Sequence, residues 1–164
     1  MRRRSFLAVL AASIVGIGGG YAASKRVAPA GRITRRTVTG VTTDDSGTQR
    51  QEDILTEQIS EMDPTTVEIR IHQDFHDTLS PDRSNTIDTT LHERFSDRYD
   101  DVWYHARHYC DPDSNGNSPC SSPRLSRPDF NDAVIDAEVR MVYRDHPWAS
   151  VVWVSSQPGD YTVD

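Results

Sequence analysis

The sequence predicts an α+β fold, in which a small antiparallel sheet ends in a C-terminal β-hairpin and has one face covered by one or two helices. The main observation is Ala133–Arg144, where odd positions are apolar and even positions are mostly charged, a period of two that is typical of a half-buried strand. A short connection leads from it into the β-branched segment Ala149–Ser156, which completes the hairpin. The length of 164 residues allows one small domain.

Four elements are expected before this hairpin. Thr48–Gln51 is compatible with a capping box and would open a short helix that Pro64 ends. Thr65–Gln73 alternates and predicts a strand. Apolar residues at every fourth position over residues 87–99 predict an amphipathic helix that begins at Ser84 or Asn85. Residues 102–110 are ambiguous, with a strand preferred. The apolar stripe of the first helix would consist of Ile54, Leu55, Ile59 and Met62.

The chain divides into three parts. Residues 1–30 have the character of a targeting or anchoring segment, with five basic residues and no acidic one. Residues 31–50 are polar, rich in threonine and interrupted by glycine, and are expected to form a linker or a loosely held stalk. Residues 51–164 are expected to form the single α+β domain.

The charge balance argues against a dedicated nucleic-acid binder. The whole chain has 25 acidic and 18 basic residues, a formal net charge of -7. Residues 31–164 alone carry 13 Arg, no Lys, 19 Asp and 6 Glu, which gives -12. A protein that neutralises phosphates needs a basic face, and nothing in this composition favours one.

The lack of lysine after residue 30, together with the large excess of Asp over Glu, resembles the composition of proteins from extreme halophiles. That resemblance implies adaptation to molar salt, where the Debye length is about 3 Å and the mutual repulsion of surface carboxylates is screened. Such a composition also fits a disordered acidic tail. The strand pattern favours the folded domain.

The N-terminus carries an export motif. Arg3 and Arg4 precede Phe6 and Leu7 at the head of a weakly hydrophobic stretch, and this resembles the signal of the twin-arginine (Tat) family. The resemblance implies that the Tat translocase is a partner during export and that the chain crosses the membrane already folded. Residues 28–30 (Ala-Pro-Ala) provide a cleavage pattern. The alternative is a retained anchor, because residues 5–24 are uncharged and just long enough to span a bilayer. The protein would then be extracellular or held at the outer face of the cytoplasmic membrane, in contact with lipid only through this segment.

Cys110 and Cys120 are the only cysteines. In an exported chain they are expected to form a disulfide, which would contribute about 2–3 kcal/mol by loop-closure entropy. Two alternatives stay open. One is a pair of free thiols, and the other is a zinc site completed by His105 and His108, although the short CxxC spacing of common zinc sites is missing.

The loop between the cysteines partly matches a calcium-binding pattern. Asp111, Asp113, Asn115 and Asn117 alternate around Gly116, and alternate oxygen ligands with a glycine turn can surround a hard cation. The twelfth position holds Ser122 in place of the bidentate Glu. A solvated turn is the simpler interpretation, and calcium is the cofactor to test.

No catalytic residue can be assigned from the sequence. Recognisable nucleophile, phosphate-loop and zinc-protease motifs are missing. We therefore expect an exported, salt-adapted, non-catalytic domain with a binding or structural role at the cell envelope, toward an envelope protein or small ligand that the sequence does not specify. The alternative is a small secreted metal-dependent hydrolase. Convergence of four histidines on one point would favour the enzyme; these are His72, His76, His105 and His108.

Overall fold

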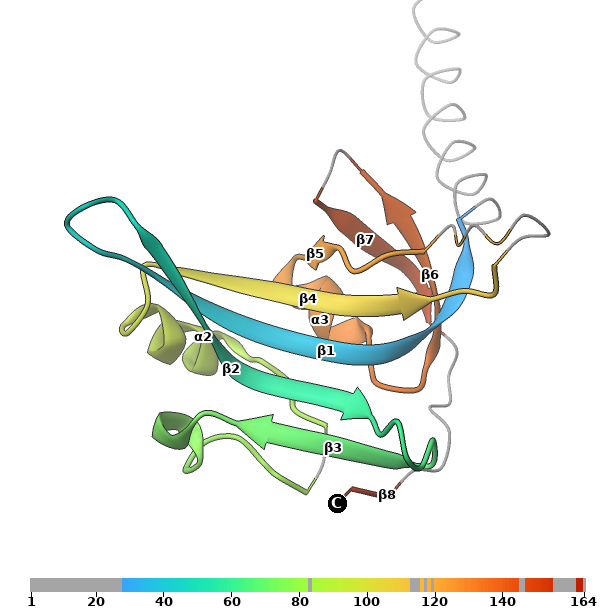
Figure 1. The fold of residues 1–164 in the computed structure, drawn as a ribbon, viewed down its shortest axis with the longest axis horizontal. Coiled ribbons are helices and arrows are strands. Elements are labelled where there is room, and N and C mark those ends of the chain that lie inside the picture. Colours follow the sequence, from blue (N-terminus) through green and yellow to red (C-terminus); the bar gives the residue numbers. More distant parts are fainter. Residues whose placement is uncertain are drawn as a thin grey trace, which may run out of the picture.

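The computed structural model describes residues 28–82, 84–112, 116, 118, 120–144, 147–154 and 162–163. They form an eight-stranded sheet, two α-helices and a short 3-10 helix (Figure 1). The strands are β1 (Ala30–Thr43), β2 (Gln49–Ile59), β3 (Thr66–Ile71), β4 (Asp101–Tyr109), β5 (Arg124–Leu125), β6 (Glu138–Tyr143), β7 (Ala149–Val154) and β8 (Thr162–Val163). The helices are η1 (Gln73–Phe75), α2 (Thr89–Ser96) and α3 (Arg127–Asp132).

The sheet is almost entirely antiparallel. Its main path runs β5-β4-β1-β2-β3-β8, and among the described strands the short β8 pairs in parallel, with β3, while Arg124 of β5 forms an isolated parallel bridge with Trp148. The hairpin β6–β7 joins the sheet at the start of β1, where Gly31 pairs with Val139. The antiparallel sheet with a C-terminal hairpin is therefore confirmed, although strands account for far more of the fold than helices do.

The helices pack on one face of the sheet, behind the strands in the view of Figure 1. Phe130 of α3 lies against Tyr104 of β4, with ring centroids 5.3 Å apart. Phe95 of α2 contacts Phe75 edge to face at 4.9 Å, and His92 of the same helix bonds the Tyr104 hydroxyl. The expected helical cover of one face is confirmed. We call this side the inner face and the opposite side the open face.

The expectation of a linker over residues 31–50 is wrong. Residues 30–43 form β1, the longest strand, which lies between β2 and β4 at the centre of the sheet. Its many threonines are β-branched and favour strands. Its charged Arg36 is accommodated in the core because it pairs with Glu57 of β2, and both side chains are almost completely buried. The structured domain therefore begins well before residue 51.

The expected helix between the Thr48–Gln51 capping box and Pro64 is also wrong, since residues 49–59 form β2. Val38 pairs with Leu55 and Thr39 pairs with Asp53, so Ile54 is the extra residue of a β-bulge. The bulge allows Ile54 and Leu55 to be buried side by side. Two adjacent apolar residues followed by Ile59 imitate the spacing of a helical stripe, which explains the error.

The remaining expected elements are found with shifted ends. The expected strands at 65–73 and 102–110 correspond to β3 and β4. Helix α2 begins at Thr89 with Asp88 as its N-cap, shorter than the 87–99 pattern, and yet Phe95 and Tyr99 are buried as that pattern requires. Strand β6 begins only at Glu138, because Asp136 adopts a left-handed backbone conformation with φ of 66°.

Helix α3 was not anticipated. Ser126 caps it by accepting a hydrogen bond from the Asp129 backbone N–H at 3.2 Å, and the Ser126 hydroxyl donates to the Asp129 carboxylate at 2.7 Å. With Pro128 in its first turn, the segment has ordinary helix-start signals. Its six residues are too few to show a helical period.

Candidate functional site

The open face of the sheet carries a pair of arginines opposite each other. Arg35 of β1 and Arg107 of β4 are direct cross-strand partners, and both are exposed. Arg35 has one ionic contact, with Asp53 at 3.8 Å. Within the described residues the Arg107 guanidinium has neither an ion pair nor a hydrogen bond to a side chain. Asp53 offsets one of the two positive charges, so a net positive charge remains here.

Two adjoining hollows share these arginines. One, of about 460 Å³, is also lined by Thr37, Asp53, His105 and Ser122. The other, of about 370 Å³, extends toward the end of β2. Burial, assisted by the charge of Arg124, lowers the pKa of His105 below its ordinary value, so this histidine adds hydrogen-bonding capacity at neutral pH and no charge. The second hollow is lined by Arg32, Thr34, Arg35, Gln58, Ile59, Ser60, Glu61, Arg107 and Tyr109.

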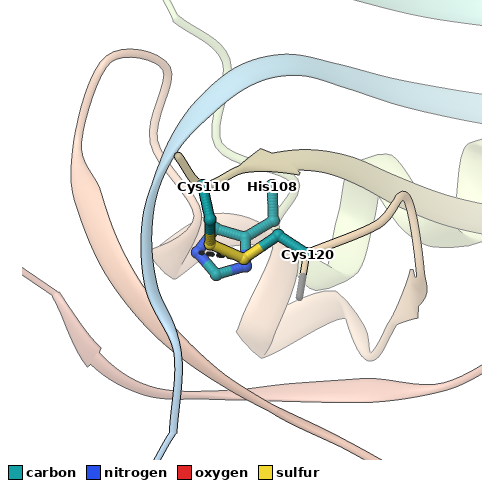
Figure 2. Close-up of side chains that lie close together, drawn as sticks. All are labelled: His108, Cys110 and Cys120. Atoms are coloured by element: carbon teal, nitrogen blue, oxygen red, sulfur yellow. Dashed lines mark hydrogen bonds between the residues drawn. A yellow bond between two sulfur atoms is a disulfide. The ribbon is translucent and has the colours of Figure 1, made fainter. Parts of the chain in front are cut away.

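A second cluster is buried where β4 meets the C-terminal hairpin (Figure 2). Cys110 and Cys120 are paired at disulfide distance, with Cα atoms 5.6 Å apart. The His108 ring lies beside them, with its Nε2 atom 3.9 Å from Cys120 Sγ. His108 and Cys110 are almost fully buried, at 2% and 5% exposure. The expected disulfide between these two cysteines is thus found, and a histidine accompanies it.

Hydrogen bonds fix the orientation of the His108 ring. Its Nδ1 atom is 2.8 Å from the Tyr143 hydroxyl, and its Nε2 atom is 3.2 Å from the Val139 carbonyl oxygen. Because the Val139 carbonyl can only accept, Nε2 carries the ring proton and donates to it, and the unprotonated Nδ1 accepts from the Tyr143 hydroxyl, whose oxygen also accepts from the Ser121 N–H. Burial lowers the pKa of His108 below its ordinary value. The ring is held neutral.

Gly31 lies against this cluster. A Cβ atom at that position would be 2.6 Å from Cys110 Sγ and 2.7 Å from His108 Nε2. Such distances leave no room for any side chain, so the close approach of β1 to the cluster requires glycine. A third hollow, of about 610 Å³, reaches Gly31 and Cys110 from the solvent and is partly lined by the carboxylates of Asp111, Asp136 and Glu138.

The structure separates the four histidines. His105 faces the hollow on the open face, whereas His108 is in the buried cluster. His72 bonds the Glu52 carboxylate at 2.9 Å, and His76 is exposed at the end of η1. Among the described residues, the single group of three or more metal-ligating side chains is His108, Cys110 and Cys120. The convergence that would have favoured the hydrolase is not observed in this part of the chain.

Most of the predicted calcium loop and the export motif cannot be placed. Asp111 is exposed just after β4. The other loop ligands, Asp113, Asn115 and Asn117, lie outside the described residues, as do all the motif residues of the leader, which are Arg3, Arg4, Phe6 and Leu7. The calcium site therefore stays a prediction.

Two features of the site are not predicted from the sequence: the arginine pair and the histidine beside the disulfide. The first depends on the register of β1 against β4, which a single sequence does not provide. The histidine beside the disulfide could have been found from the sequence. Residues two apart on a strand share a face, so a strand over 102–110 places His108 and Cys110 on the same face.

No described helix has the length and apolar character needed to cross a membrane. Comparison with family models, with curated proteins and with solved structures gives no match to this chain. The assignment of function therefore depends on the geometry alone.

Proposed function

We propose that the protein is an exported, salt-adapted, non-catalytic binding domain of the cell envelope, and that its open face binds a ligand carrying an oxyanion group such as carboxylate, sulfate or phosphate. One observation carries the proposal. Arg35 and Arg107 stand directly opposite each other at a hollow, in a chain whose residues 31–164 have a net charge of -12. The most negative part of the sequence thus presents a local cationic site.

The arginine pair destabilises the sheet when no ligand is bound, and its charge and geometry suit an oxyanion. Like charges directly opposite on neighbouring strands destabilise a sheet. An oxyanion between the two guanidinium groups would relieve that repulsion and accept bidentate hydrogen bonds from each. Thr37 and Ser122 supply neutral donors at the same hollow. In molar salt, distant charges are screened, and only such contact hydrogen bonds keep their strength.

The direct test is a titration with sulfate against chloride at constant ionic strength, with tryptophan fluorescence as the readout. Trp103 lies on the open face, and its ring centroid is 3.4 Å from the Arg124 guanidinium carbon. We expect saturable binding of sulfate that Arg35→Gln and Arg107→Gln each weaken. The matched control is Arg70→Gln, an exposed arginine already paired with Glu68, which should bind like the parent. Equal weakening in the control, or no preference over chloride, would refute the site.

A second readout needs no ligand. Because Arg107 opposes Arg35, Arg107→Gln should stabilise the ligand-free domain by about 0.2–1 kcal/mol at low ionic strength. The gain should shrink in molar KCl, where repulsion is screened. Denaturant unfolding at both salt concentrations measures it. A loss of stability on Arg107→Gln would show that the two arginines are not in conflict.

The proposed location includes a retained N-terminal anchor. Ala28 is buried and its carbonyl accepts from Arg140 at 3.0 Å. The Pro29 carbonyl accepts from the Met141 N–H, and Ala30 pairs with Arg140 in the sheet. A protease that cuts after Ala30 needs this segment extended and free, whereas a chain exported in the folded state presents it inside the sheet. Intact mass measurement of the exported protein should find residues 1–30 attached.

Export itself is tested at the leader. Replacing Arg3 and Arg4 by lysine should trap the protein inside the cell, because the paired guanidinium groups are what the Tat pathway recognises. Unchanged appearance of the variant outside would remove the Tat assignment, and it would leave the sulfate titration unaffected.

A further inference from the structure

We infer that the chain, when Cys110 and Cys120 are reduced, binds one Zn²⁺-like divalent ion through His108 Nε2 and the two cysteine sulfurs. Nothing in the proposed oxyanion binding requires this site, which lies at the junction of β4 with the hairpin and not in the hollows lined by Arg35 and Arg107. The candidate ligand atoms lie within 4.8 Å of one another. They come from the end of β4 and from the returning segment before β5 (Figure 2).

The spacing suits a tetrahedral ion. With Zn–S bonds of about 2.3 Å and Zn–N bonds of about 2.1 Å, the ligand atoms of such a site are separated by roughly 3.5–3.8 Å. The His108–Cys120 separation of 3.9 Å is close to this value, and the two sulfurs reach it once their covalent bond is cut. Two thiolates and an imidazole are a donor set that zinc prefers over calcium or magnesium.

The surroundings of His108 match those of a metal-bound histidine. Ligating histidines characteristically use their other ring nitrogen for a hydrogen bond that fixes the ring, and here Nδ1 faces the Tyr143 hydroxyl at 2.8 Å. On metal binding the ring changes tautomer: Nε2 releases its proton to the solvent and Nδ1 takes one up, so the imidazole remains neutral and Nδ1 donates to the Tyr143 oxygen. The Val139 carbonyl then gives up its bond from Nε2.

An access route and an open coordination position complete the site. The hollow of about 610 Å³ reaches Cys110 and Gly31. Its charged lining is Asp111, Asp136 and Glu138 against Arg32, which pairs with Asp136, so the net negative charge attracts cations. Gly31 leaves the space beside Cys110 Sγ and His108 Nε2 that any larger residue would occupy. Three protein ligands leave a fourth position to water.

A dithiol is a suitable reductant for the Cys110–Cys120 disulfide. The dithiol gives two electrons and two protons to the Cys110–Cys120 bond and closes into its own cyclic disulfide, leaving two protein thiols. The divalent ion then displaces both thiol protons to the solvent and binds two thiolates. The nascent chain carries the same two thiols before the disulfide is formed. Disulfide formation and metal binding therefore exclude each other at this site.

The test uses the full-length chain, reduced anaerobically with a phosphine and titrated with Co²⁺ as a spectroscopic probe. We expect a thiolate-to-cobalt charge-transfer band that saturates at one equivalent and disappears on addition of Zn²⁺. The oxidised chain should show no such band. Absence of the band in the reduced parent protein would overturn the proposal without reference to any variant.

Variants at His108 and His105, both on β4, supply the matched comparison, and Tyr143 of β6 supplies a third variant. Tyr143→Phe removes only the orienting hydroxyl and should weaken Co²⁺ binding about 10–100-fold, and His108→Asn, which removes a ligand, should weaken it further. His105→Asn changes a histidine of the same strand on the opposite side of the sheet and should bind Co²⁺ as the parent does. The circular dichroism of each oxidised variant reports its folding. Binding of equal strength in folded His108→Asn, or equal weakening in His105→Asn, would contradict the site.

Discussion

Arg36 and Glu57 form a buried ion pair in the core, and burying it carries a large desolvation cost. The Arg36 guanidinium bonds Glu57, and it also donates to the Phe130 and Asn85 carbonyl oxygens at 3.1 and 2.7 Å. Glu57 in turn accepts from the Asn85 N–H at 2.6 Å. Two neighbouring strands are thereby connected to α3 and to the loop before α2. Burying both charges is tolerable only because every partner is in place.

Removing one member of this pair should be costly. Glu57→Gln leaves the Arg36 charge buried without its counter-ion, and we expect a loss of about 3–5 kcal/mol in the free energy of unfolding. The control is Glu68→Gln, which breaks the solvent-exposed pair with Arg70 and should cost no more than about 1 kcal/mol. Urea unfolding at fixed salt compares them. Similar losses in both variants would show that burial of the Arg36–Glu57 pair adds little to the effect of breaking it on the free energy of unfolding.

His108 predicts a pH dependence. Burial lowers the pKa of His108 in the folded state, so the unfolded chain takes up a proton on this residue at a higher pH than the folded chain does. Stability is therefore fully present above about pH 6.5 and declines as the pH falls from that value toward the folded pKa. His105 contributes in the same direction.

The measurement is the unfolding midpoint in denaturant between pH 7.5 and 5. We expect His108→Gln to have a shallower decline with falling pH than the parent, because it removes one of the two histidines with a lowered pKa in the described part of the chain. Carboxylates with lowered pKa values, such as Asp44, act only near their own ordinary values around pH 4 and lie outside this range. An identical slope in His108→Gln would contradict the assignment.

At the scale of elements, alternation was a good guide where one face of a strand is buried and a poor one elsewhere. The apolar set of the hairpin is buried as predicted, with Val139 and Met141 both at 0% exposure. Strand β1 escaped recognition because its inner-face position 36 is an arginine. A pattern within one segment does not predict that a charged residue is buried when its partner, here Glu57, lies on another strand.

The hairpin offers a test of strand facing. Val139→Asp places an unpaired carboxylate where the side chain is fully buried, at a cost of several kcal/mol against a total stability of about 5–15 kcal/mol. We expect the domain to unfold, as seen by circular dichroism. Glu138→Gln, on the exposed neighbouring position, should change stability by no more than about 0.5 kcal/mol. Equal tolerance at both positions would mean that the facing of β6 is wrong.

On the scale of the whole molecule, the charge of residues 31–164 should make stability depend on salt. A net charge of -12 repels itself in the compact state, and the Debye length shortens from about 10 Å at 0.1 M to about 3 Å at 1 M salt. We expect the thermal midpoint to rise from 0.1 M to about 2 M KCl.

Sucrose is the control for this effect, because it favours compact states by exclusion from the surface and does not screen charge. A rise in KCl that far exceeds the rise in sucrose supports screening. An unchanged midpoint across the KCl series would contradict the interpretation of the composition as salt adaptation.

The position of β1 has a consequence for the order of folding. It is the first described strand in the chain and the central one in the sheet. Strand β2 follows directly and can pair with β1 early, but the other edge of β1 remains unpaired until residues 101–109 of β4 have emerged, and its first residues until 138–140 of β6 have. Pairings between such distant segments give a high contact order and folding times on the order of milliseconds to seconds. Translation must therefore be nearly complete before the centre of this sheet can close.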